Sequence, residues 1–381
     1  MRIVADENIP ALEAFFAGMP SVTAIERHPG RTLAPGHLKG AQVLLVRSVT
    51  PVNADLLAEA DVRFVGTATI GTDHIDEQWL SQQGIAFAAA PGCNAEGVVD
   101  YVLSTVARHC LDRRQSLWDL SVGIVGAGNV GGRLWQRLQA MGVPVCACDP
   151  PLTEAGHSGL VSLERALEQD IVCLHTPLTD IGAHPTRHLL DRHRLASLGG
   201  HQLLINAGRG AVVDNQALLQ RLSRPDPPRV ALDVWEGEPS VLTPLLPLVW
   251  QGSPHIAGYS LEGKLRGTAM LYQAFCRHFG LSECVTLEQV LPAPVTMAVA
   301  GSGEWALYRA MLAAYDPLSD HGAFVDAQQG DPRARASAFD RLRRDYPQRR
   351  EFASHRLTGV AGSAGADRFR AAGFTLSEDQ R

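Results

Sequence analysis

The pattern with the clearest chemical meaning is the glycine-rich stretch GAGNVG, in which Gly126, Gly128 and Gly131 keep the spacing GxGxxG. It follows the apolar run SVGIV and precedes a helix-like segment that begins near Val130. In this context the first glycine permits a tight turn, the second lets a pyrophosphate approach the backbone, and the third lets helix and strand pack closely. We therefore predict a dinucleotide site at the helix N-terminus, formed by Gly126, Gly128, Asn129, Val130 and Gly131.

An acidic residue, Asp149, ends the next apolar run, VPVCACD. A carboxylate in this place hydrogen-bonds the ribose hydroxyls of the adenosine half and repels a 2′-phosphate. The sequence therefore predicts NAD, not NADP, as the cofactor. The alternative is that the three glycines serve turn geometry alone.

Three residues further along the chain could bind an anion and move a proton. Arg209 follows the apolar run QLLIN, where the carboxyl end of a strand should open into the cofactor crevice, and its planar fork suits a carboxylate. Glu238 follows RVALDVW, and His255 stands in SPHIAG. A histidine paired with a carboxylate can take a proton from an alcohol and return it to a ketone. The alternatives are a surface arginine in a loop and a structural histidine.

Two other groups of residues have metal-like spacing but lack the partners that a metal site needs. His184 and His188 in HPTRH are spaced as a helical metal pair, yet Pro185 interrupts the helical turn and no third ligand lies nearby in sequence. Cys146 and Cys148 alternate, as on opposite faces of a strand. We predict no metal site.

Composition limits the classes to which the protein can belong. The chain has 381 residues, enough for two or three domains with cores of their own. Acidic residues outnumber basic ones by 40 to 34, and the net charge of -6 argues against a nucleic-acid partner. The seven cysteines include no CxxC pair and are typical of reduced thiols. Neither a signal peptide nor an 18-residue apolar run is visible, so we expect a cytoplasmic protein without a membrane segment.

The order of apolar runs predicts an α/β protein with two doubly wound, Rossmann-like parallel sheets. Short β-rich runs alternate with helix-like stretches up to residue 89, and a more regular alternation runs from LSVGIVGAG to PHIAG. The helix-like segment from Leu261 to Phe279 is followed by no strand and should pack back on the first domain. We predict a substrate-binding domain over 1–93 and 258–286 and an NAD-binding domain over 94–257.

Taken together, GAGNVG with Asp149, NAGRG, DVWEGEP and PHIAG resemble the D-2-hydroxyacid dehydrogenase family in their order and separation. The resemblance covers about residues 1–285. It implies that Arg209, Glu238 and His255 form the catalytic set. It also implies contacts to the nicotinamide and ribose from Thr176, Ala207, Gly208, Arg209, Asp233 and Gly258.

Four further stretches resemble one branch of this family: RSVTPVN, GTATIGTDHID, APGCNAEGVVDYV and HIAGYSLEGK. Members of that branch oxidise a 4-phosphorylated erythronate to a 2-oxo-3-hydroxy-4-phosphobutanoate in the synthesis of pyridoxal 5′-phosphate. The resemblance implies substrate contacts from Ser48, Thr67 and Tyr259. Arg47 could add a guanidinium for the phosphate, although a surface arginine beside a helix cap is equally natural there.

The last part of the chain, past about residue 290, is rich in arginine and also holds many aromatic residues, so it is not a solvated tail. Together with the resemblance, this predicts an α+β C-terminal dimerisation domain over 287–381 and a homodimer. The stretch RLRRDYPQRRE could complete the phosphate end of the substrate site, with Arg349 the first candidate and Arg350 the next. The alternative is a solvated charge run on a helix face.

Two rival functions stay open from the sequence. The first is another hydroxyacid dehydrogenase, such as one acting on 3-phosphoglycerate, because its three catalytic residues would look the same. The second is a non-catalytic NAD-sensing binding protein that has kept the fold. The presence of all three residues Arg209, Glu238 and His255 argues against the second.

Overall fold

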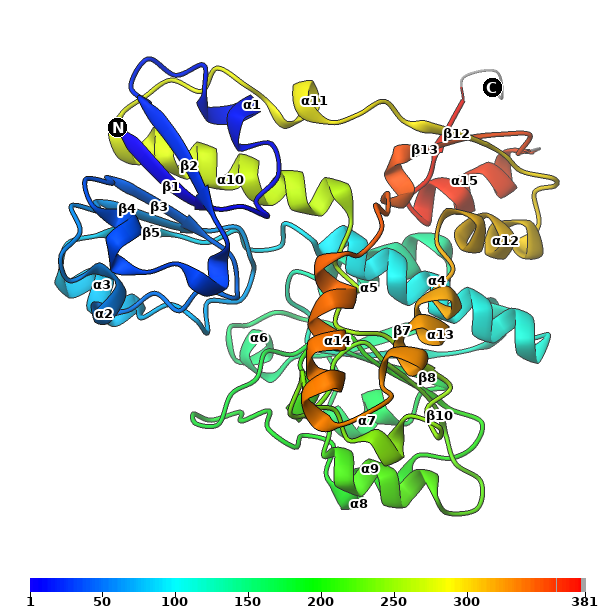
Figure 1. The fold of residues 1–381 in the computed structure, drawn as a ribbon. Helices are drawn as coiled ribbons and strands as arrows, with labels where there is room; N and C mark the ends of the chain where they lie inside the picture. The colour runs from blue at the N-terminus through cyan, green and yellow to red at the C-terminus, as the bar shows by residue number, and fades with distance from the viewer. Residues whose placement is uncertain (361, 378–381) are drawn as a thin grey trace. The chain divides into compact units, whose positions relative to one another are not determined.

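The computed structural model describes residues 1–360 and 362–377 and divides into two compact units (Figure 1). The first unit comprises Met1–Asn94 and Ser260–Ala293. The second unit comprises Ala95–Tyr259 and the chain from Pro294 onward. Every strand pairing in both units is parallel, which confirms the predicted α/β class with two doubly wound sheets.

The first unit is built on a five-stranded sheet in the order β2-β1-β3-β4-β5. Its strands are β1 (Arg2–Asp6), β2 (Ala24–His28), β3 (Val43–Val46), β4 (Phe64–Thr67) and β5 (Ala86–Ala88). Its helices are α1 (Leu12–Phe16), α2 (Ala54–Leu57), α3 (Glu77–Gln82), α10 (Leu261–Phe279) and α11 (Leu287–Val290). The apolar sequence VLLV makes β3 buried along its whole length, as expected of a parallel strand covered on both faces.

Helix α10 belongs to the first unit although it follows the second sheet in sequence. It packs against α1, β4 and β5, and in Figure 1 it lies beside the blue strands of this unit. The Tyr272 ring meets the Phe16 ring edge-on, with their centroids 5.4 Å apart, and Phe275 meets Phe16 at 5.3 Å. This aromatic cluster ties the returning chain to the first sheet.

The second unit contains a six-stranded sheet in the order β11-β10-β9-β8-β6-β7. Its strands are β6 (Val122–Val125), β7 (Val145–Cys148), β8 (Ile171–Leu174), β9 (Leu203–Asn206), β10 (Arg229–Leu232) and β11 (Gln251–Gly252). The helices of this region are α4 (Ala95–Arg113), α5 (Gly131–Met141), α6 (Pro150–Glu154), α7 (Leu163–Leu167), α8 (Arg192–Ser197) and α9 (Asn215–Leu222). The strand order reverses next to β6, so the loop after β6 lies at the switch point where such sheets bind ligands.

The last segment adds a small parallel sheet in the order β12-β13-β14 and four helices. Its elements are β12 (Val295–Ala298), α12 (Glu304–Ala314), α13 (Leu318–Ala327), α14 (Pro332–Arg344), β13 (His355–Thr358), α15 (Ser363–Ala371) and β14 (Thr375–Leu376). Helix α12 packs on α4, and the Tyr308 hydroxyl accepts a hydrogen bond of 2.7 Å from the Leu117 N–H. Because this segment shares a hydrophobic core with the second unit, its separation as a third domain stays a prediction.

No helix within residues 1–360 and 362–377 combines the length and the apolar character that crossing a bilayer requires. All seven cysteines are free thiols in the structure, and only Cys284 is exposed.

Candidate active site

The glycine-rich loop between β6 and α5 has the shape that a dinucleotide phosphate needs. Gly126 has φ +89°, and a Cβ on Gly131 would lie 1.8 Å from the carbonyl oxygen of Gly126, so both positions require glycine. A Cβ on Gly128 would meet nothing within 4 Å, so packing inside the protein does not explain that glycine. Close approach by a pyrophosphate does explain it, and the loop therefore fits NAD.

Asp149 directly follows β7 and lies against the glycine-rich loop. Its Oδ2 accepts the Ala127 N–H at 2.8 Å, and its Oδ1 accepts the Leu152 N–H at 3.1 Å as the N-cap of α6. The side chain remains partly exposed, so the carboxylate can also meet a ribose. A negative charge after the second strand of such a fold would oppose the 2′-phosphate of NADP.

Replacing Asp149 by Asn should narrow the preference for NAD over NADP by about tenfold or more, because the like charge that opposes the 2′-phosphate is removed. Asn keeps the size and one acceptor oxygen, so it can keep the cap on the Leu152 N–H but loses the bond from the Ala127 N–H. The affinity for NAD itself is therefore measured as the control for the shape of the loop. The measurement is kcat/KM with each cofactor for both proteins. Equal use of both cofactors by the native chain would refute the role of Asp149.

The loops after β8 and β9 come together beside the glycine-rich loop. A Cβ on Gly208 would lie 3.1 Å from the Thr176 carbonyl oxygen, so the two loops are in contact, and Ala207 lies next to Gly208. The Thr176 hydroxyl is buried without a hydrogen-bond partner. A buried hydroxyl without a partner is costly, and a bound cofactor amide or ribose could satisfy it. These residues fit the predicted nicotinamide side of the site.

Asp233 has a structural role that the sequence did not reveal. Its Oδ1 accepts hydrogen bonds from the Ser253 hydroxyl at 2.7 Å and from the Ile256 N–H at 2.8 Å, while its Oδ2 accepts the Ala257 N–H at 3.0 Å. The side chain is 1% exposed. Its carboxylate therefore holds the loop that carries His255 and then Gly258.

His255 and Glu238 form the pair that the sequence predicts. The His255 Nδ1 lies 2.5 Å from Glu238 Oε1, and Glu238 Oε2 accepts the Trp235 N–H at 3.1 Å. His255 has φ +57°, an uncommon backbone conformation that its N–H maintains by donating to the Asp233 carbonyl at 2.7 Å. Because Nδ1 faces the carboxylate, Nε2 is the ring nitrogen left to exchange a proton with a substrate.

The Glu238 carboxylate stays charged because of its neighbours. Burial alone would raise the pKa of Glu238, but the charge and hydrogen bond of His255 lower it. The Trp235 N–H and the charge of Arg343 lower it further, and the resulting pKa lies below its ordinary value. Glu238 therefore presents a negative charge to the imidazole at neutral pH.

Replacing Glu238 by Gln should move the acid limb of the kcat/KM profile for oxidation to lower pH and reduce the maximal rate. The neutral amide no longer favours the protonated imidazole, so the basic form of the ring persists to lower pH. The measurement is the full pH profile of both proteins. An acid limb that stays in place would argue against the coupling of Glu238 to His255.

Arg209 lies in an extended segment between β9 and the turn Gly210–Val212. Its Nη1 donates to the Gly208 carbonyl at 3.0 Å, and the side chain is partly exposed. A Cβ on Gly210 would lie 2.0 Å from the Trp235 carbonyl carbon, so the loop of Arg209 packs directly on the segment that leads to Glu238. The structure thus places all three predicted catalytic residues in adjoining loops of one unit.

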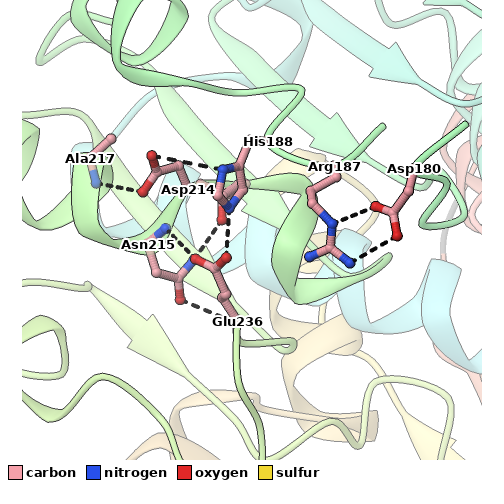
Figure 2. Close-up of polar contacts among 8 residues, drawn as sticks. Asp180, Arg187, His188, Asp214, Asn215, Ala217 and Glu236 are labelled. Atoms are coloured by element: carbon pink, nitrogen blue, oxygen red, sulfur yellow. Dashed lines mark hydrogen bonds and ion pairs between the residues drawn. The ribbon is translucent and has the colours of Figure 1, made fainter. Parts of the chain in front are cut away.

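A polar cluster that the sequence did not predict joins these loops (Figure 2). The His188 Nε2 donates to Glu236 Oε1 at 2.6 Å, while Glu236 Oε2 accepts the Asn215 N–H at 3.1 Å. The Asn215 side-chain oxygen in turn accepts the Glu236 N–H at 3.2 Å. The His188 N–H donates to the Ala211 carbonyl at 2.7 Å, two residues after Arg209. The cluster therefore connects the Arg209 loop to the Glu238 loop.

The same cluster includes three atoms with the chemistry of metal ligands, on His188, Asp214 and Glu236, all within 4.8 Å of one another. Each of these side chains already has a partner inside the protein. Asp214 accepts the Ala217 N–H at 2.8 Å as the N-cap of α9, and the other two form the pair described above. Hydrogen bonding accounts for the cluster, and we assign it a positioning role.

Replacing His188 by Ala should lower kcat by about tenfold with little change in the KM for NAD, because a small misplacement of catalytic groups is costly while the dinucleotide loop is untouched. His188→Gln, which can still donate to Glu236, should restore most of the rate. Arg187→Ala is the matched control, since the hydrogen bonds of the Arg187 side chain run to Asp180 at the surface and Glu236 has only a weaker influence on its charge (Figure 2). Equal losses from the Ala and Gln variants, or a loss confined to KM, would contradict this role.

The predicted substrate residues of the first unit lie at the carboxyl ends of neighbouring strands. Arg47 and Ser48 follow β3, Thr67 ends β4, and Val46 pairs with Thr67 in the sheet. Ser48 is exposed, whereas Thr67 is fully buried. The Thr67 hydroxyl already contacts Thr69 Oγ1 at 2.7 Å and His74 Nε2 at 3.0 Å. Ser48 and Arg47 are thus better placed than Thr67 to contact a ligand.

The prediction that Arg349 meets the substrate phosphate disagrees with its surroundings. Arg349 is buried, its Nη2 donates to the carbonyls of Gly97 and Ala257, and its guanidinium lies 4.3 Å from the centroid of the Tyr315 ring. Arg349 therefore stabilises the end of the His255 loop through its hydrogen bond to the Ala257 carbonyl. Tyr259, the remaining predicted substrate residue, is partly exposed, and its ring meets that of Tyr346 edge-on at 5.9 Å.

Comparisons with known proteins agree with this geometry. A family model described as the NAD-binding domain of D-isomer specific 2-hydroxyacid dehydrogenases matches residues 104–257, and a model of a domain of unknown function matches residues 290–373. An erythronate-4-phosphate dehydrogenase of Marinobacter nauticus is 51% identical over 386 residues, which cover 99% of this chain and 100% of the relative. One of Pseudomonas aeruginosa is 51% identical over 363 residues, covering 94% of this chain and 95% of the relative.

Solved structures share the fold as well. The crystal structure of a D-lactate dehydrogenase from Aquifex aeolicus, complexed with NAD and lactic acid, matches with a TM-score of 0.57 and 22% identity. The match covers 74% of this chain and 96% of that chain.

Proposed function

The chain belongs to the erythronate-4-phosphate dehydrogenases, a branch of the D-2-hydroxyacid dehydrogenases, and from that premise we propose that it oxidises 4-phospho-D-erythronate to (R)-3-hydroxy-2-oxo-4-phosphobutanoate with NAD. The observation that carries the proposal is the 2.5 Å contact of His255 with Glu238, in loops adjoining the one that holds Arg209. The product of this reaction would serve the synthesis of pyridoxal 5′-phosphate.

Each of the three residues has a separate task in this reaction. His255 Nε2 accepts the proton of the C2 hydroxyl, and Glu238 orients the ring and stabilises the imidazolium that forms. The Arg209 guanidinium holds the substrate carboxylate and polarises the developing carbonyl oxygen. NAD, when bound, supplies the hydride acceptor, and the glycine-rich loop with Asp149, Thr176 and Gly208 would hold it.

The test is the absorbance of the reduced nicotinamide after 4-phospho-D-erythronate is added to the protein and NAD. The assay is run with and without 2-oxo acids, because a reduced cofactor that stays bound would limit turnover unless it is reoxidised in place. Continuous turnover in either arm supports the proposal. Faster turnover of 3-phosphoglycerate would favour the rival dehydrogenase, and no turnover of any 2-hydroxy acid would favour an NAD-sensing protein.

Substrate contacts from Arg47, Ser48, Thr67 and Tyr259 are part of the same proposal. Support comes from the placement of the first three at the ends of β3 and β4 and from the partial exposure of Tyr259. The carboxyl ends of parallel strands are where open α/β sheets bind their ligands.

We also infer a homodimer formed through the last segment. The edge strand β12 supports this, because Val295 is 44% exposed and most of the strand is open to solvent. Uncovered edge strands are prone to pair with another chain. The full-length chain should sediment as a dimer and Val295→Glu should weaken the dimer, whereas Leu248→Glu, at a leucine that is 39% exposed, should not. A full-length chain that sediments as a monomer would refute the dimer.

A cytoplasmic location is inferred on similar grounds. Seven free cysteines are typical of a reducing compartment.

A further inference from the structure

Arg343, near the end of α14, occupies an unusual position beside the predicted substrate residue Tyr259. Its guanidinium lies 5.7 Å from the centroid of the Tyr259 ring and 6.0 Å from that of Phe339. The side chain is partly buried, and its Nε is buried without a hydrogen-bond partner. The two rings flank the cation, and the Tyr259 hydroxyl also acts on it as a hydrogen-bond acceptor, but the Nε–H stays without a partner.

The charges of two carboxylates, Glu238 and Asp340, act on Arg343. Neither of them forms an ion pair with it among the contacts that the structure describes, whereas the next residue, Arg344, pairs with Asp345 at 2.9 Å. Arg343 also acts on the active site. Its charge helps to lower the pKa of Glu238, although burial and His255 have larger effects on that pKa. The positive charge of Arg343 therefore acts on Glu238, one member of the catalytic pair.

An arginine in such surroundings is costly unless a ligand completes its hydrogen bonds. Partial burial weakens its hydration, and a guanidinium has five N–H donors in a planar fork that matches phosphate oxygens. The other arginines of this stretch are less suitable. Arg349 also has a buried nitrogen without a partner, Nη1, but it is only 7% exposed and its Nη2 donates to two carbonyl groups. Arg344 is exposed and paired.

We propose that Arg343 is the specificity-determining residue of the active site and binds the phosphate group of the substrate, with Tyr259 as the platform that holds its guanidinium. This inference rests on the proposed function, in which the substrate has a carboxylate at one end and a phosphate at the other. Arg209 takes the carboxylate, and Arg343 takes the phosphate. The two arginines thus fix the C2 hydroxyl between them, in reach of His255.

The test compares Arg343→Gln with the matched control Arg344→Gln on two substrates, 4-phospho-D-erythronate and unphosphorylated D-erythronate. Arg343→Gln should raise the KM for the phosphorylated substrate by about tenfold to a hundredfold, because a charge-assisted bidentate contact is lost. For D-erythronate the loss in kcat/KM should be much smaller, because only the influence of Arg343 on Glu238 is removed there. Arg343→Lys should show an intermediate loss on the phosphorylated substrate, since it keeps the charge without the fork.

A second readout needs no turnover. With NAD saturating the dinucleotide loop, inorganic phosphate should raise the melting temperature of the native chain and of Arg344→Gln, but raise that of Arg343→Gln much less, because a ligand that binds the folded state stabilises it. If the native chain oxidises neither substrate, the proposed function fails, while this readout still tests the anion site. Equal losses on both substrates with unchanged stabilisation by phosphate would overturn the inference and leave Arg343 a modulator of Glu238.

Discussion

Replacing His255 by Ala should lower kcat for the oxidation of 4-phospho-D-erythronate by about 10² to 10⁴-fold, the usual contribution of a general acid–base group. The reason is that Nε2 is the ring nitrogen turned away from Glu238, so no other group in the pair can accept the C2 hydroxyl proton. The measurement is steady-state kinetics together with NAD binding by fluorescence or calorimetry.

NAD binding should stay close to that of the native chain in this variant. The phosphates are expected at the loop around Gly128 and the ribose at Asp149, whereas the His255 ring pairs with Glu238 in another loop. His193→Ala is a suitable control, because that histidine is exposed on α8. If His255→Ala kept more than half of the native kcat, His255 would not be the general base.

The part of the site that could be predicted from the sequence is the part fixed by local backbone geometry. Gly126 and Gly131 stand where any Cβ would be strained or would collide, so their spacing indicates the loop directly. Asp149 follows the strand that pairs with β6, so a short-range pattern suffices to place it. The parallel α/β class follows for the same reason, because apolar strands and helices alternate along the chain.

Other roles depend on contacts between residues far apart in the sequence. In the sequence His188 stands out only for its metal-like spacing from His184. Its hydrogen-bond partner in the structure, Glu236, is 48 residues away, so no short-range pattern indicates the pair. The resemblance assigns Asp233 to the cofactor, and it does not reveal that the carboxylate also accepts the N–H groups of the His255 loop. A motif places a residue on a strand end, but it does not say whether the side chain turns toward the ligand or toward the next loop.

The arginines of the last segment show the same limit. Arg343 lies four residues after the buried Phe339, so the two share one face of α14, and helical periodicity could have identified it. The sequence favours Arg349 only by its place in RLRRDYPQRRE, which says nothing about the carbonyls of Gly97 and Ala257 to which it donates. In an arginine-rich stretch the burial of each side chain, and not the charge count, decides its role.

Replacing Arg209 by Lys should lower kcat/KM by about 10² to 10³-fold, comparable to the loss of a hydrogen-bond donor to a developing oxyanion. Lys keeps the positive charge but lacks the planar fork that holds a carboxylate by two parallel hydrogen bonds. The loop itself should tolerate the change, because the only side-chain hydrogen bond that the structure gives Arg209 runs to the adjacent Gly208 carbonyl.

Arg187→Lys is the matched control for this variant, since Arg187 pairs with a single surface carboxylate, that of Asp180, and lies in a neighbouring loop of the same unit (Figure 2). The control should keep the native kcat/KM. In Arg209→Lys both kcat and kcat/KM should fall, because the guanidinium acts on the carbonyl oxygen as charge develops as well as on the bound carboxylate. A rise in KM at constant kcat would restrict Arg209 to substrate binding, and native kinetics would remove it from the catalytic set.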